Sequence, residues 1–306
     1  MDLNDYRNEK FSNDYVDANL KRSLQHFFAL TARESFSVSP ADEDVVRDAG
    51  DGAAALVRDY FDMMLEQVGE RRRNLKDFQG IQFVSIGEDC FSRTILTQWG
   101  VKPFAKLGEK SGPFDLSVHP ITSTIKLFQT DFEGYLDPEN LGFVEKYNFI
   151  SNHKVKVSFN HETGPTYTED GFQPLIDIYT RRLKQFRAVM ASEAPTVLVF
   201  HSRSPTASTG QHITQLWNAV KSRWSVDDKL MVCLRTWPHG AEIIPSATID
   251  DPRVTVMDIH YPREGYVWHL PRYCFTREGF EFERRVVDFV KRAAIQFQRQ
   301  PSLAPA

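Results

Sequence analysis

The sequence predicts a three-layer α/β domain, in which helices flank a mainly parallel sheet, preceded by a helical N-terminal extension. From residue 81 onward, short β-rich runs alternate with amphipathic segments, which is typical of βα units. Several of these runs are almost continuously apolar, as expected for parallel strands buried on both faces. The 306-residue chain is 41% hydrophobic and contains 23 phenylalanines, which indicates a large core.

The first 77 residues contain no convincing strand. We expect a helix near residues 14–30 and a longer one over residues 51–73, where apolar residues repeat every three or four positions. The arginines at 71–73 are expected to complement the dipole of that helix and to lie in solvent. We therefore predict a helical extension over residues 1–77, an α/β catalytic domain over 78–298 and a tail over 299–306. The extension is a candidate surface for oligomerisation or a partner contact.

The strands and helices of the α/β domain follow from periodicity. We expect strands over residues 81–87, 154–159, 196–203, 229–236 and 254–260. Between and after them, an apolar face predicts helices over residues 91–99, 121–132, 175–186, 213–224 and 276–297. Thr276 is expected to cap the last of these helices. The order of elements is Rossmann-like, with each helix covering a face of the sheet.

The net charge and the number and spacing of the cysteines exclude several classes of protein. A net charge of −4 gives no general attraction to nucleic acid or anionic lipid. The N-terminus resembles no signal peptide, and no run reaches the ~20 apolar residues of a membrane helix. The three cysteines form neither a disulfide framework nor a CxxC metal pattern, which suits a reducing compartment. We expect a cytoplasmic protein that spans no membrane and binds no nucleic acid.

Polar residues follow several predicted strands at their carboxyl ends, where open parallel sheets bind ligands. The candidates gathered at this edge are Gly87, Glu88, Asp89, Cys90, Asn160, His161, His201, Ser202, Arg203, Asp258 and His260. A cysteine, three histidines and carboxylates would thus meet at one rim. We expect Gly87, His201, Arg203, Asp258 and His260 to contribute to substrate binding.

Cys90 is the candidate nucleophile. A thiol at a helix N-terminus meets unpaired amides and positive partial charge, which favour the reactive thiolate. Gly87 would permit the tight turn that presents the thiol. Glu88 and Asp89 oppose activation unless they turn toward helix amides or a cation, because nearby carboxylates raise a thiol pKa. The alternative is that Cys90 is a small buried residue, as we expect for Cys233 and Cys274.

His161 is the candidate general base, since it follows a predicted strand and would lie near the rim. A zinc site made from His161, His201, His260 or His269 lacks any paired spacing, and we expect no metal. Asp258 and His260 show D-x-H, whereas SGNH-type hydrolases carry D-x-x-H, so that likeness is loose.

Several motifs in order resemble a bacterial family of papain-like cysteine peptidases, the domain of unknown function DUF1796. They are "SIGEDCFSRTILTQWGV", "GPFDLSVHPITSTIKLFQTDFEGYLDPENL" and Phe159-Asn160-His161, within a resemblance that spans about residues 81–275. The family pattern has tryptophan where this chain has Leu116, and Asp-Phe where it has Glu162-Thr163. These departures concern substrate contacts more than the chemistry.

The resemblance implies that Cys90 and His161 are the nucleophile and base, with Asp115 as a third polar residue that orients the histidine or holds the loop. The order of elements fits a papain fold poorly and an SGNH-like or related acyltransferase architecture better. Arg181 and Arg182, on a helix similar to the family's arginine-containing helix, are expected to join Arg203 in holding an anionic substrate.

Two hypotheses from different classes follow. The first is a thiol-dependent acyl hydrolase or acyltransferase acting on a small-molecule or glycan substrate, in bacterial carbohydrate or cell-surface polymer metabolism. It requires no cofactor, although an acyltransferase would use coenzyme A. The second is a non-catalytic α/β module that binds a glycan, nucleotide or protein partner, in which Cys90 is unreactive.

Overall fold

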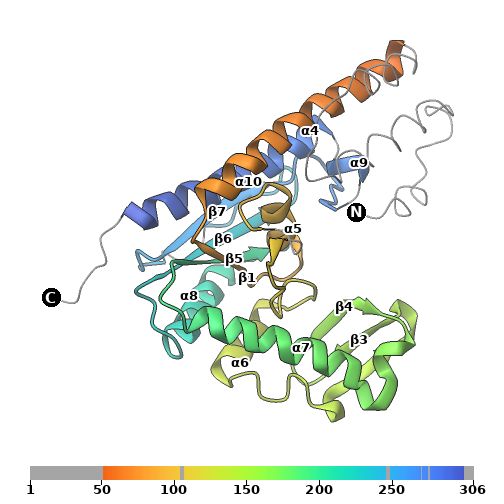
Figure 1. The fold of residues 1–306 in the computed structure, drawn as a ribbon, viewed down its shortest axis with the longest axis vertical. Helices are drawn as coiled ribbons and strands as arrows, with labels where there is room; N and C mark the ends of the chain where they lie inside the picture. Colours follow the sequence, from red (N-terminus) through yellow and green to blue (C-terminus); the bar gives the residue numbers. More distant parts are fainter. Residues whose placement is uncertain (1–50, 104–106, 246–248, 270, 275, 300–306) are drawn as a thin grey trace.

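The fold was analysed in a computed structural model, which describes residues 51–103, 107–245, 249–269, 271–274 and 276–299 (Figure 1). The helix expected near residues 14–30 and the tail beyond residue 299 lie outside the described residues. None of the described helices is long and apolar enough to cross a membrane.

The central sheet has four strands in the order β1-β5-β6-β7, and every neighbouring pair is parallel. Its strands are β1 (Gln82–Ser85), β5 (Thr196–Ser202), β6 (Lys229–Trp237) and β7 (Val254–His260). All residues of β5 and β6 are buried, as their continuous apolar runs predict. The predicted parallel sheet is therefore confirmed.

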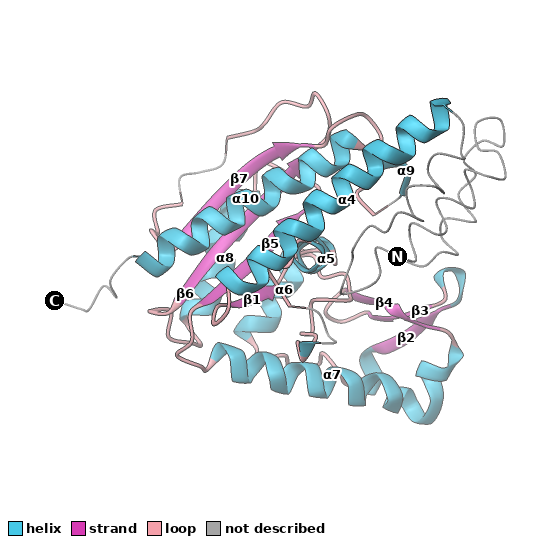
Figure 2. Cartoon of the chain, turned by 45° about the horizontal axis from the view of Figure 1, so that its top comes forward, coloured by secondary structure: helices cyan, strands magenta, loops and turns pink. Residues whose placement is uncertain are grey.

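Helices cover both faces of this sheet, so the predicted three-layer architecture is also confirmed (Figures 1 and 2). One face packs on α4 (Asp51–Asp77), α5 (Phe91–Gln98) and α10 (Arg277–Arg299). The other packs on α6 (Ile121–Gln129), α7 (Glu169–Met190) and α8 (Thr209–Lys221). The Thr276 hydroxyl accepts a hydrogen bond from the Gly279 amide at 3.1 Å, which confirms the predicted cap of α10. The short α9 (Pro271–Cys274) precedes it.

A second, antiparallel sheet was not expected. It consists of β2 (Leu141–Val144), β3 (Phe149–Asn152) and β4 (Val157–Thr163), accompanied by the 3₁₀ turns Pro138–Asn140, Glu145–Tyr147 and Pro165–Thr168. The prediction of a parallel strand over 154–159 was wrong, because residues 153–156 form the turn that joins β3 to β4. The Asn152 side chain accepts hydrogen bonds from the amides of Lys154 and Val155, and Lys156 is left-handed with φ 56°. These local interactions favour a turn over an extended strand.

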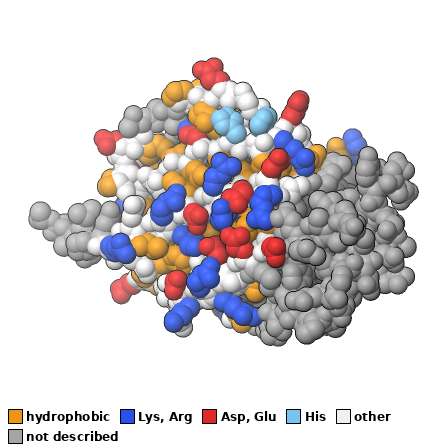
Figure 3. Space-filling view, turned by 90° about the horizontal axis from the view of Figure 1, so that it is seen from above, with side chains coloured by type: hydrophobic (Ala, Val, Ile, Leu, Met, Phe, Trp, Pro, Cys, Tyr) orange, Lys and Arg blue, Asp and Glu red, His pale blue; other side chains and the backbone are white. Residues whose placement is uncertain are grey.

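Helix α4 packs against the α/β domain. Its Asn74 and Arg71 side chains donate to the carbonyls of Trp99 and Gln98, each at 2.7 Å, at the C-terminal end of α5. Arg71 is therefore half-buried, and the expectation that all three arginines at 71–73 lie in solvent was wrong for this residue. Acidic and basic side chains interleave on the face of the molecule that carries α4 and α10 (Figure 3). Arg284 of α10 pairs with Glu66 of α4 at 2.8 Å. The domain boundary at residue 77 stays a prediction.

Candidate active site

The candidate active site lies where the connections of two neighbouring parallel strands diverge. After β1 the chain enters α5 on one face of the sheet, and after β5 it enters α8 on the opposite face. Open α/β sheets bind ligands at the carboxyl ends of their strands at such a switch point. The turn from β1 to α5 carries Cys90.

Gly87 allows this turn to pass close to β5. A Cβ atom at this position would lie 2.8 Å from the His201 backbone nitrogen, closer than real side chains tolerate. The turn is held there because the Glu88 amide donates to the His201 carbonyl at 2.9 Å. Cys90 then occupies the N-cap position of α5 and is half-buried. Gly87 therefore shapes the turn and presents the thiol.

The two acids before Cys90, Glu88 and Asp89, each make hydrogen bonds with other residues. The Asp89 carboxylate accepts from the Phe91 amide at 3.0 Å and contacts His201 Nδ1 at 2.8 Å. The Glu88 carboxylate accepts from the Ser202 hydroxyl at 3.3 Å and the Arg203 amide at 3.1 Å. Both acids thus join the end of β1 to the end of β5, and Asp89 also binds the first amide of α5.

The Cys90 thiol is nonetheless protonated at neutral pH in this conformation. Burial raises the pKa of Cys90 to about 11, and the negative charge of Asp89 adds to that rise. A hydrogen bond with Thr94 and the positive charge of Arg93 act in the opposite direction. A reactive Cys90 therefore needs a group that takes its proton when substrate binds.

His161 approaches from β4 of the antiparallel sheet. A bridge between Val118 and Ser158 carries β4 toward the turn after β1, and the His119 amide donates to the Glu88 carbonyl at 3.2 Å. The His161 side chain is exposed, and no hydrogen bond joins it to Cys90, both residues being among those described. Although the side chain is exposed, part of it packs against neighbouring atoms, and this partial desolvation lowers the pKa of His161. Glu162 opposes the change, while Arg93, Arg182 and His269 reinforce it. The imidazole is neutral at pH 7 and able to accept a proton.

Asp115 is buried and organises the loop after α5. Its carboxylate lies 3.3 Å from Lys102 Nζ, accepts from the Gly112 amide at 2.7 Å and lies 4.0 Å from Arg93 Nε. None of these partners is His161. The contacts are those of a loop-holding residue, the second of the two roles that the family resemblance implies.

The remaining residues predicted to bind substrate fall into two groups: some side chains are exposed, and others are held by contacts within the protein. Arg181 and Arg203 are exposed. Arg182 pairs with Glu162 at 2.8 Å and stacks over Tyr179, whose hydroxyl donates to the same carboxylate at 2.9 Å. Arg182 thus contacts the residue that follows His161 in β4, and its charge lowers the pKa of His161.

Asp258 and His260 do not form a catalytic pair. Asp258 accepts from Arg235 and from the Trp237 indole at 2.6 Å, and His260 contacts the Ala241 carbonyl at 2.7 Å. The described residues contain no group of three or more histidines, cysteines or carboxylates arranged to hold a metal ion.

A buried chain of hydrogen bonds runs from Asp89 through His201 to Thr236. His201 Nε2 lies 3.0 Å from the Thr236 hydroxyl, so the three side chains follow the order acid, imidazole, hydroxyl of a hydrolase triad. His201 and Thr236 are both 0% exposed, however, which leaves the hydroxyl out of reach of any substrate. His201 therefore supports the loop instead of binding substrate directly.

Sequence reasoning missed Arg93, which follows Cys90 by three residues on α5. It lies beside Asp115, and its charge acts on both Cys90 and His161. The spacing of three along a helix was the available signal, because it places the guanidinium on the same face as the thiol.

Comparison with known proteins agrees with the motifs. Residues 81–229 match the family described as "Putative papain-like cysteine peptidase (DUF1796)", and the match contains Cys90, Asp115 and His161. No curated protein and no solved structure matches the chain. The resemblance to this family is therefore confirmed over residues 81–229.

Proposed function

We propose that the protein is a thiol-dependent acyl hydrolase or acyltransferase in which Cys90 is the nucleophile and His161 the general base. The family is described as a cysteine peptidase, which supports thiol chemistry in general terms. The observation that carries the proposal is the place of Cys90, at the start of α5 and at the switch point between β1 and β5.

The raised pKa of Cys90 favours transfer of the thiol proton at the moment of attack over a thiolate that exists before substrate binds. Neutral His161 accepts the thiol proton as Sγ bonds to the substrate carbonyl carbon, and the carbonyl electrons move onto oxygen. Arg93 and the first-turn amides of α5 other than that of Phe91, which Asp89 holds, stabilise that oxyanion. When the tetrahedral intermediate collapses, protonated His161 returns its proton to the leaving group and a thioester remains. Water or an acceptor then attacks the thioester and restores the thiol.

The surroundings favour an anionic substrate. Arg181 and Arg203 are exposed, and Arg182 retains a buried Nη1 that has no hydrogen-bond partner among the described residues. These cations suit a carboxylate or phosphate on a small molecule or glycan, or the phosphates of coenzyme A in an acyltransferase. We place this activity in the bacterial cytoplasm, in carbohydrate or cell-surface polymer metabolism.

The alternative is a non-catalytic binding module, which the elevated Cys90 pKa favours. Alkylation with iodoacetamide between pH 5 and 11 separates the two functions. The enzyme hypothesis expects reaction at Cys90 well below pH 11, and loss of that reaction in His161→Ala. Cys274→Ala is the matched control and should leave the rate unchanged.

A Cys90 that alkylates with one inflection near pH 11 in both the parent and His161→Ala would overturn the enzyme hypothesis. Turnover of aryl ester and thioester substrates provides the second measurement. Cys90→Ala should abolish it, and unchanged turnover in that variant would exclude Cys90 as nucleophile.

A further inference from the structure

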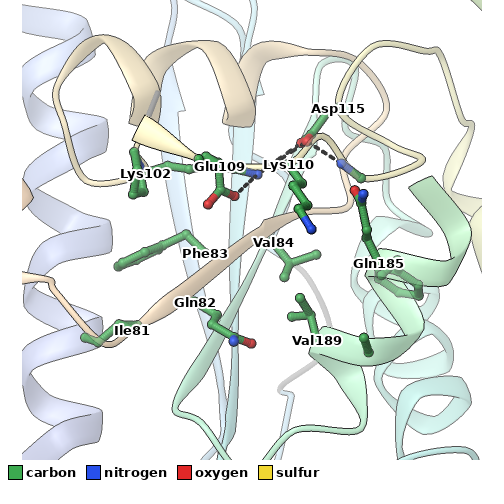
Figure 4. A pocket seen from close by; sticks show the side chains of 15 residues that line it. Ile81, Gln82, Phe83, Val84, Lys102, Glu109, Lys110, Asp115, Gln185 and Val189 are labelled. Atoms are coloured by element: carbon green, nitrogen blue, oxygen red, sulfur yellow. Dashed lines mark hydrogen bonds and ion pairs between the residues drawn. The ribbon is translucent and has the colours of Figure 1, made fainter. Parts of the chain in front are cut away.

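A cavity of about 330 Å³ lies against the edge of β1, apart from Cys90 (Figure 4). Its apolar wall includes Phe83 and Val84 of β1 and Val189 of α7, and its polar wall includes Lys102, Lys110 and Gln185. This volume is at the lower end of the range of ligand pockets.

One wall of the cavity is an edge strand. Among the described residues, β1 pairs only with β5. The Gln82 amide donates to the Pro195 carbonyl, directly before β5, at 2.8 Å, and the Ile86 amide donates to the Val199 carbonyl of β5 at 3.0 Å. The alternation of a parallel strand therefore directs the N–H and C=O groups of Phe83 and Ser85 away from β5. Figure 4 looks onto this edge, with Phe83 directed to one side and Val84 to the other. Phe83 lines the cavity and Ser85 continues the same edge beyond it, so the cavity borders the first of two residues whose main-chain groups are spaced to pair with another strand.

The two lysines of the polar wall differ in whether an ion pair within the protein neutralises them. Lys102 lies 3.3 Å from Asp115 and 3.5 Å from Glu109, so its charge is neutralised within the protein. Lys110 is exposed, and no ion pair holds it within the described part of the chain. A ligand in the cavity would meet one available cation.

We propose that this cavity binds an extended acidic peptide, which adds to β1 as a fifth strand and places a carboxylate near Lys110. A peptide main chain supplies the alternating donors and acceptors that Phe83 and Ser85 match. Its side chains contact Val84 and Val189, and the carboxylate pairs with Lys110. Glycans and acyl chains lack the amide spacing that this edge requires.

The test uses the full chain and a fluorescein-labelled pentapeptide, Thr-Val-Thr-Val-Asp, measured by fluorescence anisotropy. We expect saturable binding that Lys110→Glu weakens at least tenfold, whereas Lys184→Glu, an equal charge change at an exposed α7 position outside the cavity, changes it less than twofold. N-methylation of the peptide amides that face β1 should abolish binding, whereas N-methylation of the alternate set, which faces away, should not.

Hydrogen exchange locates the peptide. Bound peptide should slow exchange of the Phe83 and Ser85 amides. Absence of binding at 1 mM peptide, equal effects of both lysine variants, or insensitivity to N-methylation would each overturn the proposal. Cys90→Ala should bind the peptide like the parent, so this result is independent of whether the protein is a thiol enzyme.

Discussion

Asp89 performs two functions whose effects on Cys90 conflict. Its carboxylate holds His201 and the Phe91 amide, which fixes the turn that presents the thiol. The same negative charge raises the pKa of Cys90, after the larger contribution of burial. The sequence identified both acids as opponents of activation, and the structure gives the reason that they are present: they join the ends of β1 and β5.

Replacing Asp89 with asparagine should therefore lower the pKa of Cys90. The amide oxygen still accepts from the Phe91 amide, while the charge is removed. The pH dependence of alkylation compares the thiol pKa in Asp89→Asn with that in the parent, and we expect the lower value in Asp89→Asn. Glu88→Gln removes a charge that is directed toward Ser202 and Arg203, and it should change the thiol pKa less. A pKa that rises in Asp89→Asn would contradict this explanation.

Replacing Arg93 should change the pKa of Cys90 in the opposite direction to Asp89→Asn. Its positive charge lowers the pKa of both Cys90 and His161, so Arg93→Gln should raise both values. Nuclear magnetic resonance titration of the His161 imidazole and alkylation of Cys90 measure them separately. Lys126→Gln, at an exposed position on α6, is a control that should move neither pKa.

At the scale of elements, the periodicity of apolar residues predicted those helices and strands whose own sequence shows which of their faces are buried. The apolar runs of β5 and β6 specify buried parallel strands, and that of β7 specifies a half-buried strand at the edge of the sheet. The four-residue repeat of Phe91, Ile95 and Trp99 specifies α5. The antiparallel sheet escaped prediction because β2 and β3 have only four residues each, too few to show a periodic pattern. Likewise, the contacts between α5 and residues beyond 110 depend on tertiary structure, which is why Arg93 was missed.

The turn between β1 and α5 makes a quantitative prediction about Gly87. A methyl group there would meet the His201 backbone at 2.8 Å, so Gly87→Ala must displace one of the two strand ends. We expect a loss of about 1–3 kcal/mol of unfolding free energy, measured by urea denaturation. Gly142→Ala is the matched control, because a Cβ at Gly142 meets nothing within 4 Å. Equal stability of the two variants would show that the turn has room to relax.

At the scale of the whole molecule, α10 closes over α5 and thereby covers the element that carries Cys90. Trp99, at the C-terminal end of α5, donates its indole N–H to Glu283 of α10 at 2.9 Å, and both side chains are buried. The same residue's carbonyl accepts from Asn74 of α4. Three helices that are distant in sequence thus converge on Trp99, and one of their contacts contains a titratable group.

Glu283 should make the stability of this assembly depend on pH. Burial raises its pKa to about 7 from the ordinary 4.5, so the folded protein binds a proton that the unfolded chain releases. The contribution of Glu283 is fully present below pH 4.5 and is lost as pH rises through 7, a difference of up to about 3 kcal/mol. Glu283→Gln, which stays neutral, should raise the unfolding free energy at pH 8 and leave it nearly unchanged at pH 5. Glu278→Gln, at an exposed position of the same helix, should show the parent's pH dependence. Urea denaturation at both pH values measures the difference, and an equal effect of Glu283→Gln at pH 5 and pH 8 would mean that the buried carboxyl does not titrate in this range.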